Sequence, residues 1–520
     1  MVWRMEDPQG NEAGKCKYDI VPYTRGVGLD LGCGPHKAFP HFIGMDSGKD
    51  TALFGIKMKP DVTLKTCERL EDDVHAESCD FVFSSHLLEH IVDHFAALRE
   101  WWKVIKPGGH LVLYLPHKDL YPNIGQPGAN PDHVHDFMPE DIIDAMRQVG
   151  FDWSLLVNET RSGGMEYSFL QVFRKEKPGC GHDYPYFTAL KPGKKVCIVR
   201  YGGFGDMIQA ANLLPELKRQ GYHVTVMTTP KGADILKHDP HVDAFFLQDN
   251  DQVPNHELVE FWEAQAKHYD CFINLCESVE GTLLAMPGRA NHAWPHAVRH
   301  KHLNQNYLEW TAELAEVPYQ SETRFYSTPE EDAAALALLG RGEFNVMVVL
   351  SGSSQHKFYP RMDSVIAHLL LDVPEARVIL SGDMACKILE AGWENEPRVI
   401  STSGEMGVRE TLTLAKFADC VVGPETGVLN AVAFAPNAKV CLLSHSSVEN
   451  LTKHWVNTAS LLPDVPCYPC HRLHYGREYC FEDAESGAAL CQLSIPSWQV
   501  IDSIARAYVA WKKERVNEPA

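Results

Sequence analysis

The 520-residue sequence lacks two features, a long apolar run and an excess of positive charge. No stretch reaches the ~18 consecutive apolar residues that a membrane-spanning helix needs, so we expect no transmembrane segment. The first residues contain no apolar core of the kind found in secretory signals, so none is expected. Lys and Arg number 48 against 69 Asp and Glu, a formal net charge of −21. Because phosphate attraction depends on clustered cations, this balance argues against a nucleic-acid binder and against residence on an anionic membrane surface.

The 15 cysteines of the chain are mostly scattered. Several lie in strand-like apolar runs, as Cys197, Cys271 and Cys441 do, where a small buried hydrophobe is the simplest interpretation. This usage favours a reducing environment, and we expect a cytoplasmic location. The length allows two or three domains, each with its own core.

The first recognisable motif is a strand that runs into a glycine loop, VGLDLGCGP at residues 27–35. Its glycines allow the backbone to approach a ligand closely. A second short strand ends in Asp46, which is placed to accept hydrogen bonds from ribose hydroxyls. A glycine loop alone also occurs in ordinary turns, so the prediction depends on the motifs farther along the chain.

The next pieces continue the pattern of an open α/β sheet. Residues 79–86 (CDFVFSSH) are typical of a strand with polar residues at its carboxyl end, where such sheets bind ligands. It is followed by LLEH, a helical stretch at 95–105, a KPGG turn at 106–109 and a strand at 110–115. In combination they resemble the class I S-adenosylmethionine-dependent methyltransferases over residues 27–175.

This resemblance implies a Rossmann-like fold with S-adenosylmethionine as cofactor. It implies these cofactor contacts: Asp30, Gly32 and Gly34 at the methionine part, Asp46 at the ribose, Thr66 and Cys67 by the adenine, and Ser85 and His86 near the sulfonium. Two features depart from many relatives. The stretch between Pro35 and Phe42 is too short for the usual first crossover helix, and Thr66 stands where an acid is common.

Histidines supply the candidate base of this domain. His133 and His135 lie in NPDHVHD, a polar loop before a helix predicted at 139–149, where a general base for O-methylation would be well placed. Surface histidines that cap a turn would give the same pattern. His86 and His90 are spaced i, i+4 and could share a helix face, but the spacing alone is weak support for a metal site.

Residues 175–195 are rich in Pro, Gly and charge and predict a domain boundary. A second unit then opens with a buried strand at 196–199, a glycine turn and a helix with Asp206 in its first turn. Strands at 222–227, 243–247 and 269–275 lead to a helical stretch at 303–315. A second half repeats this pattern, with strand segments at 345–350, 377–382, 419–427 and 439–443. Two α/β halves that face each other across a cleft make the GT-B architecture.

Four motifs of this unit, in order, carry a closer resemblance: VRYGGFGDMIQAANLLPELKRQG, GSSQHKFYP, ILSGD and GPETGVLNAVAFAPNAKVCLLS. They are similar to the heptosyltransferase-type family, glycosyltransferase family 9, over about residues 194–511. An acceptor hydroxyl must lose a proton as it attacks the anomeric carbon, and a carboxylate in the cleft can take it. Asp206 matches the family's catalytic Asp; a mere helix cap is the alternative.

The resemblance also implies a nucleotide-sugar site. Its residues would be Gly205, Ser353, Ser354, Lys357, Met406, Glu425, Thr426 and Gly427. A Lys and hydroxyl or backbone donors stabilise a leaving diphosphate without a divalent ion. Glu425 and Asn430 replace the usual Asp and His of the family. The donor sugar and base can therefore differ from ADP-heptose, which stays one candidate.

A four-cysteine cluster, Cys467, Cys470, Cys480 and Cys491, has the spacing C-x2-C-x9-C-x10-C. The CxxC pair with two later thiolates suits tetrahedral zinc or iron. It resembles the cysteine iron finger of the autotransporter heptosyltransferases, with His471 and His474 as substitute ligands, and its expected role is structural. A final helix, 496–516, should pack on the domain through one face. That face would contain Trp498, Ile501, Ile504, Tyr508 and Trp511.

The sequence thus predicts an α/β protein of several parts: a methyltransferase-like domain (1–176), a linker (177–195), a GT-B acceptor lobe (196–335), a nucleotide-sugar lobe (336–495) with a metal finger (467–491), and a C-terminal helix (496–520). We expect a bifunctional enzyme that acts on a glycan, lipopolysaccharide or protein acceptor, in an oligomeric state left open. One alternative is a glycosyltransferase whose first domain is a non-catalytic scaffold. The other, less well matched, is an NAD-dependent oxidoreductase with tandem Rossmann units.

Overall fold

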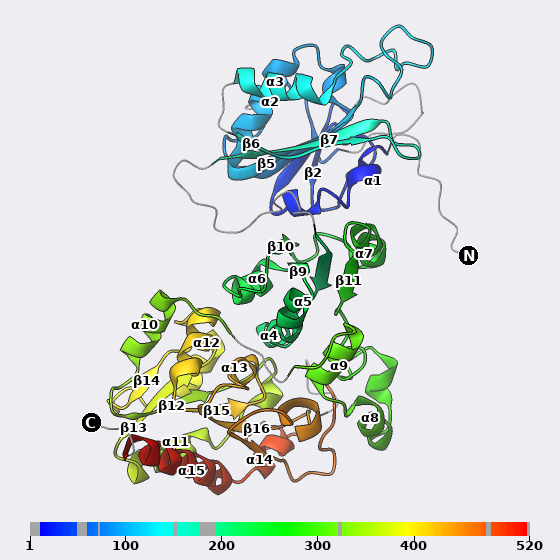
Figure 1. The fold of residues 1–520 in the computed structure, drawn as a ribbon. Coiled ribbons are helices and arrows are strands. Elements are labelled where there is room, and N and C mark those ends of the chain that lie inside the picture. Colours follow the sequence, from blue (N-terminus) through cyan, green and yellow to red (C-terminus); the bar gives the residue numbers. More distant parts are fainter. Residues whose placement is uncertain are drawn as a thin grey trace. The chain divides into compact units, whose positions relative to one another are not determined.

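The structure is a computed structural model that describes residues 11–48, 60–70, 73–149, 153–176, 193–320, 325–474 and 480–516. The chain divides into two units (Figure 1). Unit 1 contains residues 1–192 and 246–270, and unit 2 contains residues 193–245 and 271–520. Most of the predicted linker, 177–192, lies outside the described residues. None of the described helices is long and apolar enough to span a membrane.

Unit 1 is organised around a seven-stranded sheet in the order β3-β2-β1-β4-β5-β7-β6. The strands are β1 (Gly28–Leu31), β2 (Ile43–Asp46), β3 (Val62–Thr63), β4 (Cys79–Ser85), β5 (Ile105–Pro116), β6 (Trp153–Arg161) and β7 (Ser168–Lys175). Pairings from β3 to β5 are parallel, and β7 is antiparallel to both of its neighbours. Because β1, β2 and β4 are adjacent and parallel, their carboxyl ends meet at one edge of the sheet.

Two helices, α2 (His94–Val104) and α3 (Pro139–Val149), pack against each other and cover one face of this sheet (Figure 1). Trp101 and Trp102 of α2 are fully buried there in a core that also contains Ile142 and Met146 of α3. Asp93, just before α2, caps the helix, because its carboxylate accepts the N–H of Ala96 at 3.0 Å. The shorter elements of the unit are α1 (Ala13–Cys16), η1 (Val21–Tyr23), η2 (Leu88–His90), η4 (Asn255–Glu257) and α7 (Leu258–Ala266).

The stretch 246–270 packs on residues 17–25 of the same unit. The rings of Phe261 in α7 and Tyr18 lie 5.9 Å apart in an edge-on arrangement. Gln252 Nε2 donates to the backbone oxygen of Val21 at 2.7 Å, and the Arg25 guanidinium pairs with Asp249 at 2.9 Å. Unit 1 is therefore completed by a piece of chain that comes after the predicted linker.

Unit 2 contains two sheets. The first has the order β10-β9-β8-β11, with β8 parallel to β9 and to β11. Its strands are β8 (Lys195–Val199), β9 (His223–Thr228), β10 (Ala244–Leu247) and β11 (Cys271–Asn274). The helical elements of this lobe are α4 (Phe204–Ala210), η3 (Ala211–Leu213), α5 (Leu214–Arg219), α6 (Pro230–Leu236), η5 (Ala290–Ala293), α8 (His296–Leu303) and α9 (Tyr307–Leu314).

The second sheet is wholly parallel, in the order β14-β13-β12-β15-β16-β17. Its strands are β12 (Phe344–Val349), β13 (Ala376–Ser381), β14 (Val399–Ser401), β15 (Cys420–Pro424), β16 (Ala438–Leu442) and β17 (Thr458–Leu461). The surrounding helical elements are α10 (Pro329–Leu338), η6 (Gln355–Lys357), α11 (Met362–Asp372), η7 (Met384–Glu390), α12 (Val408–Phe417), α13 (Gly427–Ala431), η8 (Val448–Thr452), α14 (Leu490–Ser494) and α15 (Ser497–Val516).

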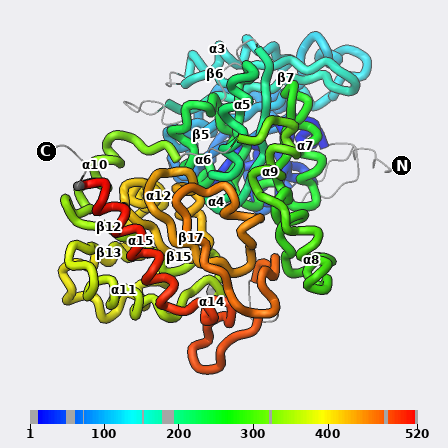
Figure 2. The backbone as a smooth tube through the Cα atoms, turned by 60° about the horizontal axis from the view of Figure 1, so that its bottom comes forward, coloured from blue at the N-terminus to red at the C-terminus, as the bar shows by residue number. Residues whose placement is uncertain are grey.

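Helix α15 lies beside α11 on the C-terminal lobe (Figure 2). Its Val500 and Ile504 are buried in the lobe's core, and Ile501, Tyr508 and Trp511 pack against that core. Trp498 does not share this face: its side chain is 63% exposed at the first turn, so the predicted face was wrong at that position. Val500 occupies the buried position instead.

Two other predictions about local structure need correction. The KPGG sequence is not a turn but lies within β5, where the register shifts between Cys79 and Phe81 of β4 and the bulge places Gly108 at φ +87°. The predicted helix 303–315 is α9 alone, because Asn306 accepts the N–H groups of Leu308 and Glu309 and caps it. The sequence pattern also failed to indicate the antiparallel pair β6 and β7. The absence of a helix between β1 and β2, in fully described residues, agrees with the short spacing there.

Candidate functional site

The glycine loop after β1 adopts a backbone that other residues rarely take. Gly32 and Gly34 have φ of +70° and +56°. A Cβ on Gly32 would meet the Leu87 side chain at 2.9 Å, so the close packing needs glycine. The N–H of Gly34 donates to Asp46 Oδ2 at 3.1 Å, which joins the ends of β1 and β2. The glycine loop and the predicted ribose acid therefore lie side by side.

Asp30, just before this loop, is 2% exposed, and its Oδ2 accepts the N–H of Ala38 at 2.9 Å. Burial raises the pKa of Asp30 to about 7, against the lowering effect of the Ala38 N–H. Thr66 and Cys67 follow β3. The Thr66 hydroxyl is exposed and donates to Glu68, whereas the Cys67 backbone oxygen accepts the indole N–H of Trp101 at 2.9 Å.

Ser85 and His86 stand at the carboxyl end of β4. The Ser85 hydroxyl oxygen is buried and has no hydrogen-bond partner among the described residues. His86 takes a left-handed backbone with φ +50°, its Nε2 lies 3.0 Å from Ser168 Oγ, and burial lowers its pKa to about 3. A buried hydroxyl without a partner beside a glycine loop fits a polar cofactor such as S-adenosylmethionine.

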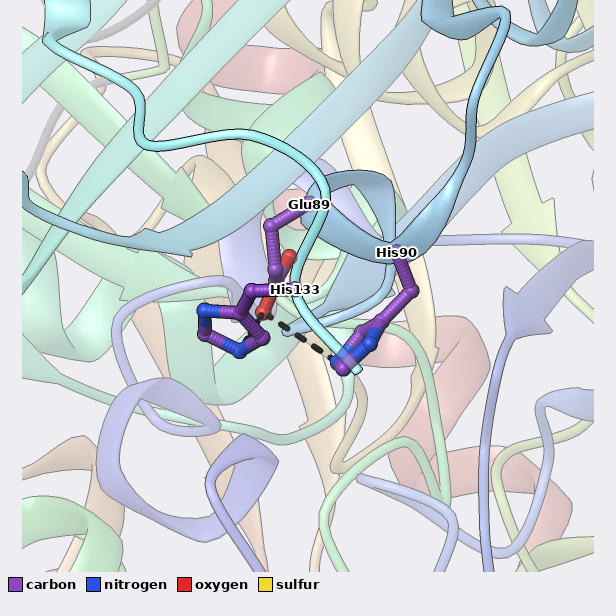
Figure 3. A group of neighbouring side chains, drawn as sticks. All are labelled: Glu89, His90 and His133. Carbon is purple, nitrogen blue, oxygen red and sulfur yellow. Dashed lines mark ion pairs between the residues drawn. The ribbon is translucent and has the colours of Figure 1, made fainter. Parts of the chain in front are cut away.

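The loop that contains His133 and His135 is held against η2 by its main chain. The N–H groups of Val134 and His135 donate to the backbone oxygen of Glu89 at 2.9 and 3.1 Å. His133 thereby lies beside Glu89 and His90, and Figure 3 shows the Glu89 carboxylate between the two imidazoles. His135 is not part of this group, because its Nε2 lies 3.2 Å from the backbone oxygen of Val92.

The ionisation of this group is strongly affected by burial. Glu89 is fully buried, and burial raises its pKa to about 8. Burial, with a smaller contribution from His90, lowers the pKa of His133 to about 4. Burial therefore disfavours the charged form of both side chains.

In unit 2, Asp206 is the third residue of α4, and both of its oxygens have partners. Oδ2 accepts the N–H of Gly203 at 2.9 Å, so Asp206 does cap its helix. Oδ1 accepts from Arg200 Nη2 at 2.7 Å. Arg200 is 2% exposed and also makes a two-bond pair with Glu280, with both N···O distances at 2.9 Å. Asp206 is thus held by a buried guanidinium that a second carboxylate keeps in place.

The two lobes of unit 2 approach each other closely at α4 and α13. A Cβ on Gly205 would lie 3.0 Å from the Cα of Gly427, and one on Gly427 would lie 2.8 Å from the backbone nitrogen of Gly205. Neither position tolerates a larger residue. The neighbours of these glycines are Asp206 and Thr426, and the Thr426 hydroxyl is buried without a hydrogen-bond partner among the described residues. Asp206, the predicted base, and Thr426 and Gly427 of the predicted donor site therefore lie at the same contact between the lobes.

A cavity of about 490 Å³ lies in the same unit. Three cationic side chains line it, those of Arg299, Lys357 and Arg472, together with the hydroxyls of Ser354 and Ser444. Lys357 is buried, its Nζ donates to the backbone oxygen of Glu425 at 2.9 Å, and burial lowers its pKa. This lining can neutralise a negatively charged ligand.

Glu425 lies behind this wall, 3% exposed. Its Oε1 lies 2.5 Å from both His445 Nδ1 and Ser444 Oγ. Despite burial, which raises it, the pKa of Glu425 is lowered to about 2, chiefly by His445 and Lys357. Ser353 is exposed, and Met406 precedes the Gly407 cap of α12; neither lines the cavity.

All four cysteines of the predicted metal cluster line this cavity, and each is a free thiol. Cys470 Sγ lies 3.9 Å from His474 Nε2, whereas His471 faces His300 at 3.0 Å. Within the described residues, the group of three potential ligands that lies within 4.8 Å is Glu89, His90 and His133. The donor chemistry of the thiols fits a thiophilic metal, but no three of their sulfurs are that close together. The metal finger stays a prediction.

Several residues of these sites were not predicted from the sequence. Arg200 directly follows a buried strand, and a charge at that point is a signal that could have been used. Glu89 lies within the LLEH motif but was assigned no role. Arg472 lies inside the four-cysteine segment 467–491 but was assigned no role. Glu280 and Arg299 lie far from the motifs in sequence, and no local pattern identifies them.

Comparison with known proteins finds a similarity to methyltransferases in the N-terminal part of the chain. Residues 20–154 match the family model described as "Methyltransferase domain". A curated relative, the malonyl-[acyl-carrier protein] O-methyltransferase of Marinomonas sp. (strain MWYL1), is 34% identical over 74 residues. The match covers 14% of this chain and 27% of that protein, so this chain spans about a quarter of its length.

Solved structures similar to the chain include three glycosyltransferases. Escherichia coli ADP-heptose lps heptosyltransferase II is 14% identical, with a TM-score of 0.42, over 61% of this chain and 99% of that one. A family 9 glycosyltransferase from Veillonella parvula is 12% identical, with a TM-score of 0.45, over 63% of this chain and 100% of that one. The iron-containing dodecameric glycosyltransferase TibC of enterotoxigenic E. coli is 13% identical, with a TM-score of 0.43, over 66% of this chain and 85% of that one. The predicted fold class is confirmed apart from the metal finger: residues 20–154, which match the methyltransferase model, are followed by a two-lobed α/β unit with one sheet in each lobe.

Proposed function

We propose that this protein is a bifunctional glycan-modifying enzyme. Unit 2 transfers a sugar from a nucleotide-sugar donor to an acceptor hydroxyl, and the methyltransferase domain methylates the same or a related glycan. The observation that carries the proposal is Asp206, held by buried Arg200 at the Gly205–Gly427 contact between the two lobes. A fixed, charged carboxylate at such a junction suits a general base.

The proposed sugar transfer uses the residues on both sides of this contact. The acceptor hydroxyl gives its proton to the Asp206 carboxylate as its oxygen attacks the anomeric carbon of the donor. The bond to the nucleoside diphosphate breaks, and its negative charge is stabilised by the cations of the cavity, above all Lys357. Arg200 keeps the Asp206 carboxylate oriented between turnovers.

We place the acceptor in the lobe 196–335 and the nucleotide sugar in the lobe 336–495. The structural neighbours include an ADP-heptose enzyme, so ADP-heptose is the first donor to test. Zinc or iron at Cys467, Cys470, Cys480 and Cys491 would stabilise the cavity wall, and no catalytic step passes through it. The cytoplasmic location likewise stays a prediction from the scattered free cysteines.

For methyl transfer, S-adenosylmethionine supplies a methyl group on a sulfonium. The glycine loop and Asp30 would hold its amino-acid part, Asp46 its ribose, and Ser85 would donate to the bound cofactor. Thr66 and Cys67 would border the adenine. His133 or His135 would accept the proton of the acceptor hydroxyl.

A donor screen tests the glycosyltransferase half. Thermal shift of the full chain with ADP-, GDP-, UDP- and dTDP-sugars should show stabilisation by one nucleotide class, because a ligand that binds only the folded state raises its stability. Lys357→Met, which keeps the stem and removes the charge, should lose most of that shift. No stabilisation by any nucleotide sugar would argue against the proposal.

A non-catalytic first domain is the second candidate, and one observation favours it. The chain passes from β1 to β2 without a helix, so the cofactor cleft lacks a wall that crossover helices usually provide. Titration of S-adenosylmethionine into the full chain distinguishes the two, since residues 1–176 alone would lack the 246–270 stretch that completes unit 1. Absence of binding would leave a scaffold.

A further inference from the structure

The three side chains in Figure 3 have the chemistry of a cation site. They combine one carboxylate with two imidazoles, and their ligand atoms lie within 4.8 Å of one another. Glu89 Oε1 is 3.9 Å from His90 Nε2 and 3.8 Å from His133 Nε2. Two donors that share a cation at ~2.1 Å can be at most about 4.2 Å apart, so these spacings admit an ion between them.

Among the described residues, the buried Glu89 carboxylate makes none of the hydrogen bonds that such a group normally makes within a fold. Its side chain is 0% exposed, and neither oxygen has a hydrogen-bond partner among the described residues. Carboxylates this deep are normally paired or bind a metal, because leaving them alone costs free energy. Its surroundings hold three imidazoles, with His86 Nδ1 a further 3.7 Å contact.

The hydrogen bonding around His90 prepares it as a ligand. Its Nδ1 lies 3.0 Å from the backbone oxygen of Asp132. A carbonyl oxygen only accepts, so Nδ1 carries the hydrogen and Nε2, which faces Glu89, keeps its lone pair. Metal-bound histidines typically donate their second ring nitrogen to a carbonyl in this way. The same loop places His133 through the two main-chain bonds to Glu89.

We propose that Glu89, His90 and His133 bind one divalent transition-metal cation whose open positions take the hydroxyl oxygen of the methyl acceptor. Two imidazoles and one carboxylate favour manganese, iron, cobalt or zinc over magnesium or calcium. The site lies one short turn beyond Ser85 and His86, at the sheet edge where the methyl donor is proposed to bind. The inference rests on the proposed methyl transfer and deepens it, and in it His133 is a ligand and not a free base.

The cation would make the acceptor a better nucleophile. A coordinated hydroxyl has a lowered pKa and loses its proton to water. Its oxygen then forms a bond to the methyl carbon as the carbon–sulfur bond breaks, and the sulfonium becomes a neutral thioether. An acceptor with two neighbouring hydroxyls, as a sugar has, could occupy two open positions.

The test uses Mn²⁺ added as the chloride to the full chain after EDTA treatment, with free Mn²⁺ followed by electron paramagnetic resonance. A Cys467→Ser/Cys470→Ser background excludes the thiols, which in any case favour zinc and iron. We expect about one Mn²⁺ per chain. Glu89→Gln, which keeps the shape, and His133→Asn should each raise the Kd by about tenfold or more. His75→Asn, an exposed histidine before β4, is the matched control and should change nothing.

Titration of S-adenosylmethionine into the same samples shows whether the variants are folded and separates the two proposals. Cofactor binding by all variants, with Mn²⁺ binding absent or unchanged by Glu89→Gln and His133→Asn, would overturn the cation site and leave methyl transfer standing. Mn²⁺ binding that depends on Glu89, in a protein that binds no cofactor, would support the cation site and overturn methyl transfer.

Discussion

At the scale of single residues, Asp206 carries the largest consequence. Asp206→Asn keeps an oxygen that can cap α4 but removes the base, so sugar transfer should fall by about 10²- to 10⁴-fold. Donor affinity should change little, because the replacement has nearly the same shape. Initial rates and nucleotide titration measure the two effects. Turnover within tenfold of the wild type would reduce Asp206 to a helix cap.

Asp30 gives a prediction about pH. Burial raises its folded pKa to about 7, above the ~3.8 expected in the unfolded chain. The folded state therefore keeps a proton that the unfolded state has lost, and the free energy of unfolding should fall as pH rises from about 4 to 7. The full shift corresponds to at most about 4 kcal/mol.

Asp30→Asn should flatten this dependence, since it still accepts the Ala38 N–H but does not titrate. Calorimetric unfolding at pH 4.5 and pH 8 measures it. The comparison with the wild type matters because Glu89, whose pKa burial also raises, contributes in the same direction. An identical pH dependence in both proteins would contradict the prediction.

At the scale of elements, the segment 467–491 joins two predicted sites. Its four thiols line the same cavity as Lys357, so a metal there would stabilise the wall of the donor site. Cys467→Ser/Cys470→Ser should remove about one zinc or iron per chain and lower the melting temperature. Elemental analysis checks the metal, with Glu89→Gln as the control for a cation in unit 1. Four free thiols in a metal-free wild type would end the cluster interpretation.

At the scale of the whole molecule, the question is why the two proposed transfer activities share a chain. Joining them raises the effective concentration of one site's product at the other. With one acceptor and both donors, mass spectrometry should detect a product that carries both the sugar and a methyl group. Asp46→Ala should lose the methyl group and keep the sugar, whereas Asp206→Asn should lose sugar transfer. Sugar addition without methylation, together with no cofactor binding, would leave the first domain a scaffold.

The sequence by itself determined what depends on neighbouring residues. The apolar run followed by glycine at residues 27–35 predicted β1 and its loop correctly, because Gly32 and Gly34 adopt left-handed angles that side chains disfavour. Helix α3 begins and ends where its pattern predicted, at Pro139 and Val149. Local periodicity and backbone sterics act over a few residues, so a linear pattern captures them.

Only the tertiary structure decided which distant side chains meet. It brought His133 to Glu89, Glu280 to Arg200, and the cysteines to the cavity wall of Lys357. It also decided that the Trp498 side chain is exposed and that the KPGG sequence belongs to β5. Such contacts depend on how sheets and loops pack, and their energies come from burial and charge pairing between segments that share no local pattern.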